Sequence, residues 1–209
     1  MSAESETELC NLALTSIGHK VITDIGSDTS QAGDLCRLQY SRCRDSVLRA
    51  HPWNFAVRRV ALAASATTPA FEYSYAFTLP SDPWCLKVIR TKWEAEGYSS
   101  REAYNDGVWS ESRIPYRIEG RTLLANEATC SIEYIARITD TVQFDALFTD
   151  CLAARLAAEL AIPLTDNKSM TETMWQVYTS KLEEARTVDA QEGSARETVD
   201  TTPFVTVRL

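Results

Sequence analysis

Few residues in this sequence are of the types that carry out catalysis or bind metals. There are only two histidines, His19 and His51, and neither has a Ser, Cys or Asp nearby in the spacing of a nucleophile and its base. The six cysteines are scattered and include no C-x-x-C pair, so they predict neither a zinc site nor a redox motif. The seven glycines form no G-x-G-x-x-G or P-loop motif. We therefore expect no cofactor, no metal and no catalytic centre.

One pair of carboxylates is the exception. Glu94 and Glu96 fall on the same face of an extended segment, with Trp93 and Tyr98 close by in the sequence. Enzymes that cleave glycans use two carboxyl groups, and their sites often include aromatic rings that hold the sugar. A solvated strand end accounts for the same residues without any chemistry. A glycan-degrading enzyme that uses Glu94 is therefore the alternative to a function without catalysis.

Basic residues gather on a helix predicted over residues 30–50. It carries four arginines with two aspartates among them, and the chain as a whole is acidic, with 21 Lys and Arg against 29 Asp and Glu and a net charge of −8. Binding to a phosphate backbone depends on clustered basic charge, so this pattern argues against a protein that grips nucleic acid. The arginines are predicted to lie on the faces outside the buried stripe. Arg42, Arg44 and Arg49 instead suit salt bridges with acidic residues of a neighbouring subunit, where complementary charge sets the register.

Two helices would position the N-terminal residues. Ser5-Glu6-Thr7-Glu8 is a capping box, and Gly18 supplies the end of the helix that follows. The buried stripe of the second helix includes Cys36 and Cys43, which we interpret as small core residues. His51-Pro52 ends this helix, because a residue that precedes proline is disfavoured in the helical region. The apolar face of the first helix is predicted to contain Leu9, Leu12, Ala13 and Ile17.

From Trp53 to about Ile138 the pattern is that of β-structure. The hairpin turn Glu119-Gly120 joins two of the strands. The polar segment between Glu94 and Pro115 is predicted to be a long surface loop. Strands are predicted over residues 55–62, 73–79, 85–93, 116–118, 121–124 and 131–138.

Helical periodicity returns from about Thr141. The first helix of this part is broadly apolar and is predicted to be covered on most sides and to end at Pro163. A second capping box, Ser169-Met170-Thr171-Glu172, would start the last helix, which reaches about Ala190.

The C-terminal tail has strand propensity at its end. Phe204, Val205, Val207 and Leu209 follow Pro203, and no neighbouring strand lies close to them in the sequence. We therefore expect the tail to pair with another chain or with a distant strand edge.

This order of elements predicts an α+β fold. N- and C-terminal helices would form a helical bundle that carries an inserted antiparallel β subdomain and ends in an extended C-terminal tail. The corresponding ranges are 1–52 and 141–192 for the helical domain, 53–140 for the β subdomain and 193–209 for the tail. The composition, 44% hydrophobic and 24% charged, is that of a globular protein. No apolar run approaches the ~20 residues that a membrane-spanning helix needs.

The first quarter of the chain carries a more specific pattern. Residues 11–18 read N-L-A-L-T-S-I-G, a turn with Val21 and Ile25 follows, and a helix leads to W-N-F at residues 53–55. This run, best matched over residues 8–59, resembles the tail tubular protein A family of short-tailed phages. The residues that match the motif would be core anchors, a helix end and a helix-to-strand junction, not an active site; they are Leu12, Ile17, Gly18, Trp53 and Phe55.

The resemblance implies a head-to-tail adaptor without a cofactor. Such subunits form a twelve-fold ring between the phage portal protein and the tail nozzle protein, and DNA passes through the lumen without specific binding. On this basis we expect a homo-oligomer in the virion neck, synthesised in the host cytoplasm, with no membrane contact. Its helical domain would build the ring and dock on the portal. The predicted interface residues are Arg42, Arg49, Phe204, Val205, Val207 and Leu209.

Overall fold

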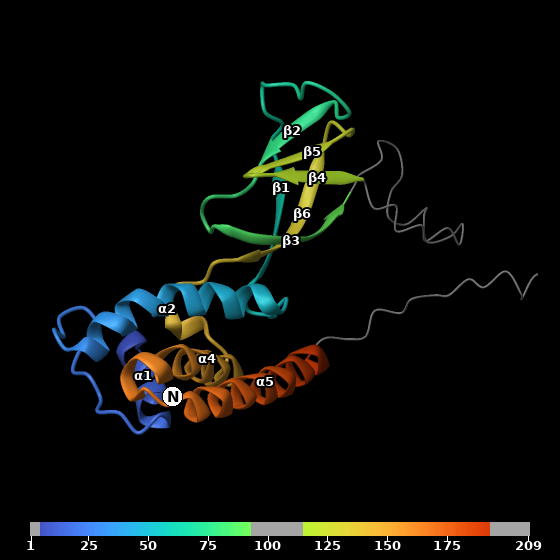
Figure 1. Ribbon diagram of the computed structural model, residues 1–209. Helices are drawn as coiled ribbons and strands as arrows, with labels where there is room; N and C mark the ends of the chain where they lie inside the picture. The colour runs from blue at the N-terminus through green and yellow to red at the C-terminus, as the bar shows by residue number, and fades with distance from the viewer. Residues whose placement is uncertain (1–4, 93–114, 193–209) are drawn as a thin grey trace, which may run out of the picture.

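The computed structural model describes residues 5–92 and 115–192, and within them the predicted α+β architecture is confirmed. A helical domain built from both ends of the chain carries a β subdomain beside α2 (Figure 1). The helices are α1 (Glu6–Ser16), α2 (Gln31–Ala50), α4 (Ala146–Thr165) and α5 (Lys168–Gln191), with a 3-10 turn, η1, at Thr141–Gln143. The strands are β1 (Val57–Leu62), β2 (Tyr75–Thr78), β3 (Cys85–Lys92), β4 (Tyr116–Glu119), β5 (Thr122–Ala125) and β6 (Cys130–Ala136).

Helix α1 begins as its sequence predicts. The Ser5 hydroxyl accepts from the Glu8 backbone N–H at 3.2 Å, and the Glu8 carboxylate accepts from the Ser5 N–H, so the capping box is complete. Gly18 has a φ of +72°, a left-handed conformation that suits glycine after a helix. The prediction for Leu12 is wrong, because 39% of this residue is exposed. The core face of α1 contains Leu9, Cys10, Ala13 and Leu14.

Helix α2 is capped by Ser30 and packs against α4. Cys36 and Cys43 are buried on its inner side, which confirms their interpretation as core residues. Arg44 does not lie on an outer face, as expected, but is only 6% exposed. Its guanidinium is paired with Asp45 at 3.0 Å, which offsets the cost of burying the charge.

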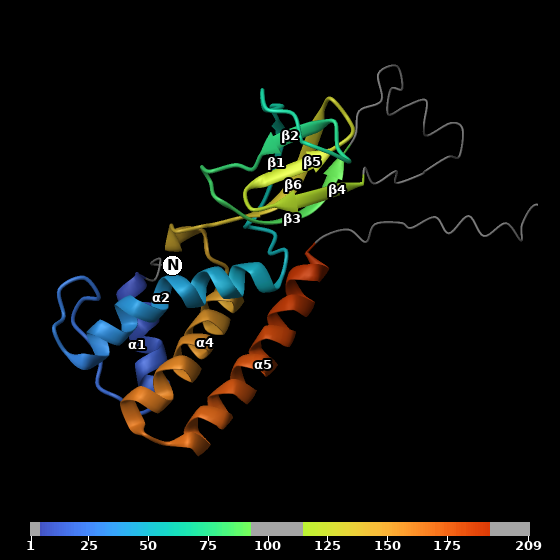
Figure 2. The ribbon, with the colours of Figure 1, turned by 45° about the horizontal axis from the view of Figure 1, so that its top comes forward.

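Helix α4 lies at the centre of the helical domain, and α1, α2 and α5 all pack against it (Figure 2). It continues through Pro163 to Thr165, so the predicted end at Pro163 is wrong. A proline in the last turn costs a single backbone hydrogen bond, and Asp166, in the left-handed conformation, closes the helix. The N-cap of α5 is Asn167 and not the predicted Ser169. None of the described helices is long and apolar enough to cross a membrane.

The β subdomain contains two three-stranded antiparallel sheets in its described part. Their strand orders are β1-β6-β3 and β2-β5-β4. The predicted hairpin is confirmed, since β4 and β5 pair around a turn in which Gly120 has a φ of +60°. Phe77, Leu123 and Ile132 are fully buried and belong to the single core that the two sheets share with the helices. The predicted loop after Trp93 lies largely outside the described residues.

Gly33, near the start of α2, offers a test of how tightly the loop before it is held. A Cβ at this position would lie 2.8 Å from the Asp28 carbonyl oxygen, which Arg37 holds through a 2.8 Å hydrogen bond. We expect Gly33→Ala to lower the free energy of unfolding by about 1–2 kcal/mol despite the better helix propensity of alanine. The control is Gly26→Ala, whose Cβ would meet only the Asp24 carboxylate at 3.3 Å. Urea unfolding checks both, and a more stable Gly33→Ala would show that the loop gives way.

Candidate functional site

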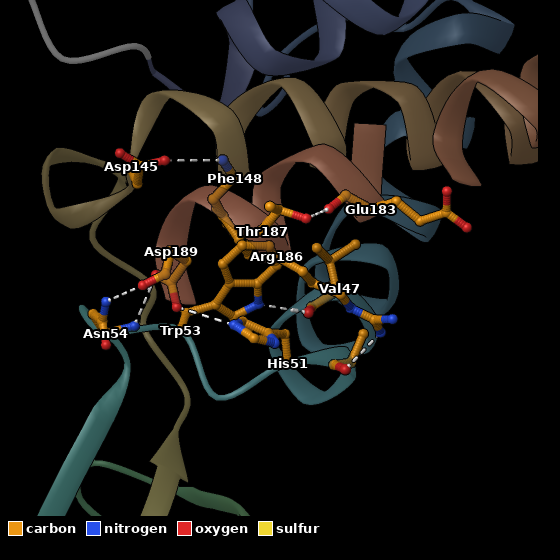
Figure 3. A network of polar contacts seen from close by, with 11 residues as sticks. Val47, His51, Trp53, Asn54, Asp145, Phe148, Glu183, Arg186, Thr187 and Asp189 are labelled. Carbon is orange, nitrogen blue, oxygen red and sulfur yellow. Dashed lines mark hydrogen bonds and ion pairs between the residues drawn. The ribbon is translucent and has the colours of Figure 1, made fainter. Parts of the chain in front are cut away.

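The segment His51–Phe55, which carries part of the family resemblance, forms the junction between α2 and β1. Trp53 is 1% exposed, and its indole N–H donates to the Val47 carbonyl oxygen at 2.9 Å. That carbonyl belongs to the last turn of α2, where backbone oxygens lack partners within the helix. The Trp53 ring meets His51 edge-on at 5.0 Å and Phe148 edge-on at 5.3 Å (Figure 3). One side chain therefore closes α2 and joins it to α4.

Aromatic packing extends this junction to the start of α4. The Phe55 ring centroid lies 5.0 Å from that of Phe148, and Phe144 lies 4.9 Å from Phe148. Asp145 caps α4 by accepting from the Leu147 N–H at 2.8 Å and from the Phe148 N–H at 3.4 Å. The chain thus enters and leaves the β subdomain at one aromatic cluster. Edge-on aromatic pairs add to the stability that comes from burying their area.

The last turn of α5 clamps the junction from the other side. One Asp189 carboxylate oxygen accepts from the Asn54 backbone N–H at 3.1 Å, and the other accepts from His51 Nε2 at 3.0 Å. The Asn54 side-chain amide donates to the Asp189 carbonyl oxygen at 2.8 Å. Arg186 donates to the Ala50 carbonyl oxygen at 2.7 Å, so a second carbonyl group at the end of α2 has a hydrogen-bond partner from outside the helix (Figure 3). The hydrogen-bond partner of the His51 ring is therefore the Asp189 carboxylate.

A second set of contacts holds the β subdomain against α2. Arg137, which follows β6, pairs with Asp45 of α2 at 2.7 Å. Arg121 lies over the Trp84 ring at 3.7 Å and Arg137 approaches the same ring at 5.3 Å, so two cations flank one indole. Arg49 donates to the Leu86 carbonyl oxygen at 2.6 Å. These contacts fix the position of β3 relative to α2.

The predicted interface residues have different surroundings. Arg49 makes the link to β3 just described, so part of its hydrogen-bonding capacity is used within the subunit. Arg42 donates to Glu159 of α4 at 3.2 Å, yet its side chain remains 64% exposed. The C-terminal residues Phe204, Val205, Val207 and Leu209 lie outside the described residues, as do Glu94 and Glu96.

Asp189 and Arg186 are the residues of this site that sequence reasoning missed. Asp189 lies 135 positions from Asn54, and nothing in the local pattern of α5 distinguishes it from the other acidic residues of that helix. Only the packing of α5 on α4 brings the two together.

The cysteines are all free and buried, and no group of three potential metal ligands occurs among the described residues. Burial raises the pKa of the Cys43 thiol to about 11 and that of the Cys151 thiol to about 12. The hydrogen bond with Cys36, followed by burial, raises the pKa of Cys10 as well. These thiols are protonated at neutral pH and poorly suited to act as nucleophiles.

The Asp189 clamp should contribute strongly to stability. Asp189→Ala would leave the Asn54 N–H and the His51 ring without their acceptor, and we expect the free energy of unfolding to fall by about 2–4 kcal/mol. The control is Glu184→Ala, an exposed carboxylate on the same helix, which should change it by about 0.5 kcal/mol or less. Urea unfolding followed by tryptophan fluorescence measures both. Equal effects of the two changes would show that the clamp is not a structural joint.

The buried thiols predict a loss of stability in alkali. An unfolded thiol ionises near its ordinary pKa of about 8.5, whereas folded Cys43 and Cys151 keep their protons up to about pH 11 and 12. Above about pH 9 the native state therefore binds more protons than the unfolded state, and stability falls by up to about 1.4 kcal/mol per pH unit for each thiol. Urea unfolding between pH 8 and pH 10.5 measures the slope, which should be smaller in Cys151→Ala. An unchanged slope in that variant would contradict the assignment.

Comparison of the sequence with known proteins assigns it to no family. No model of a known protein family matches this sequence, and a search of curated proteins finds no significant match.

Proposed function

We propose that this chain is a structural adaptor subunit of a tailed phage, which forms a ring between the portal and the tail nozzle. One observation carries the proposal: the Trp53-Asn54-Phe55 segment that resembles the tail tubular protein A family joins α2, α4, α5 and β1 around the buried indole of Trp53. Its residues hold helices and strands in a fixed arrangement. A role in mechanical connection agrees with such a joint better than a role in chemistry.

The shape of the subunit suits a ring that contacts the portal on one side and the tail on the other. The helical domain and the β subdomain lie at opposite ends of the molecule (Figure 1). In the proposed arrangement the helical domain forms the ring and docks on the portal, and the β subdomain faces the tail. Lateral contacts that repeat head to tail close into a ring when the rotation per subunit divides the circle, and we expect twelve copies from the resemblance. The net charge of −8 favours a lumen that lets DNA pass without holding it.

Electron microscopy of the purified chain mixed with portal rings from the same phage or prophage tests this function. We expect a second layer of density on one end of the portal. Mature particles should contain the chain at the neck. Portal rings that stay bare, together with particles that lack the chain, would refute the adaptor function.

The C-terminal tail is predicted to contribute to docking. Removing residues 202–209 should leave the urea midpoint unchanged and weaken binding to portal rings at least tenfold, because an extended segment adds backbone hydrogen bonds to a partner strand. A variant in which a Gly-Ser segment of the same length replaces these residues controls for chain length. If the truncated chain docks as tightly as the full chain, the tail has no such role.

A further inference from the structure

Two of the buried cysteines lie against each other where α1 meets α2. Cys10 of α1 and Cys36 of α2 are both 0% exposed, and the Cys10 thiol donates a hydrogen bond to the Cys36 sulfur. The two helices pack on one another, and both belong to the core of the helical domain (Figure 2). Two thiols in contact on different helices can be joined by a disulfide. The proposed adaptor function makes no use of this pair.

The positions of the two cysteines are fixed by the residues that follow them. The Asn11 side chain donates to the Ile22 carbonyl oxygen at 3.0 Å and accepts from the Ile22 N–H at 2.8 Å. Arg37 donates to the Ile25 carbonyl oxygen at 2.7 Å. Ile22 and Ile25 belong to the loop that joins α1 to α2, so this loop is tied to each helix directly beside its cysteine. These hydrogen bonds hold the two thiols side by side in the folded chain.

The surroundings of the pair make Cys36 the better nucleophile. The hydrogen bond from Cys10 lowers the pKa of the Cys36 thiol, and the adjacent Arg37 lowers it further, against the opposing effects of burial and of Asp28. The same hydrogen bond, together with burial, raises the pKa of the Cys10 thiol. One thiol is thus prepared to ionise while the other keeps its proton, as a thiol that attacks first and a thiol that follows require.

A third buried thiol of α2 provides a matched control. Cys43 lies seven residues after Cys36, which is about 10 Å along the helix axis. It is as deeply buried as Cys36, but its hydrogen-bond partner is Arg155 of α4. A change at Cys43 therefore removes a buried thiol from the same helix and leaves the contact between Cys10 and Cys36 in place.

We propose that Cys10 and Cys36 form a redox switch, in which a disulfide joins α1 to α2 when the chain passes from reducing to oxidising surroundings. The oxidant is a low-molecular-weight disulfide, such as oxidised glutathione. In a reducing cytoplasm glutathione keeps such a pair in the dithiol form, and the disulfide forms where that reductant is absent. The oxidised form fastens the N-terminal helix to the rest of the helical domain. This inference goes beyond the adaptor function and does not depend on it.

The disulfide forms by thiol–disulfide exchange in two steps. Neither thiol is exposed, so a reagent reaches them when α1 opens locally away from α2. The Cys36 thiolate attacks one sulfur of the reagent disulfide, and the other half of the reagent leaves and takes up the proton that Cys36 lost. The Cys10 sulfur then attacks the Cys36 sulfur and expels the second half of the reagent, which takes up the proton of Cys10. The two cysteines lose two electrons in total, and the reagent disulfide is reduced to two thiols.

Peptide mapping of the full chain tests the switch. The reduced protein is incubated in native buffer at about pH 8 with bis(2-hydroxyethyl) disulfide, a small reagent of this class, and is then alkylated and digested with trypsin without reduction. Trypsin cleaves after Lys20 and after Arg37, so the expected product is peptide 1–20 joined to peptide 21–37. Mixed disulfides with the reagent alone, the absence of any cross-link, or a main product that contains Cys43 would overturn the proposal.

Two variants and one change of conditions show whether the fold selects this pair. Cys43→Ala should keep the cross-link, and Cys36→Ala should abolish it, although both remove a buried thiol from α2. Oxidation of the wild-type chain in urea that unfolds it should give several different pairs, because the thiols are then no longer held side by side. The same single pair in unfolding urea would show that the folded structure does not select it. The wild-type measurements do not depend on the folding of either variant.

Urea unfolding tests whether the disulfide fastens α1. The bond closes the chain between positions 10 and 36 and so restricts the unfolded state, and we expect the urea midpoint of the oxidised chain to lie about 1 M above that of the reduced chain. Cys43→Ala should show the same rise on oxidation, and Cys36→Ala should show none. An oxidised wild-type chain whose midpoint is unchanged or lower, or an equal rise in Cys36→Ala, would overturn the fastening of α1 by this bond.

Discussion

The indole of Trp53 lies where α2 ends and the chain turns toward β1. Pro52 makes the helical conformation unfavourable at His51, so α2 must end there with its last carbonyl groups unpaired. Trp53 Nε1 satisfies one of them at Val47, and Arg186 of α5 satisfies another at Ala50. The same indole fills the space between α2 and α4, where Phe148 meets its edge. The contacts of this one side chain thus end α2, fill the core and orient the chain as it enters β1.

This joint connects the helical domain with the β subdomain. Asp189 ties the end of α5 to the residue that leads into β1, and Arg137 ties the residue after β6 to α2 through Asp45. Both crossings between the helical domain and the β subdomain are therefore held by charged hydrogen bonds as well as by apolar packing, which makes them directional. The adaptor function that we propose, in which the subunit connects two different neighbours, would require such directional contacts between its two parts.

The arginines of α2 show how the fold distinguishes internal charges from external ones. Arg37 holds the preceding loop through the Ile25 and Asp28 carbonyl oxygens, Arg44 is buried with Asp45, and Arg49 reaches β3. Arg42 shares its carboxylate partner with Arg155 and keeps most of its side chain in solvent. The four residues look alike in the sequence, and the difference between them arises because each position on a helix meets a different neighbour in three dimensions.

Local chemistry was sufficient to predict the elements, because it acts over a few residues. The capping box of Ser5 and Glu8, the turn at Gly120 and the helical spacing of Cys36 and Cys43 each depend on neighbours within two helical turns, and the structure has all three. The errors at Leu12, Pro163 and Ser169 arose where packing or a competing cap overrode a local pattern. The α+β class and the order of helices and strands therefore follow from the sequence. The contact of Asp189 with Asn54 across 135 residues and that of Arg42 with Glu159 across 117 do not, because such pairs form only once the core has packed.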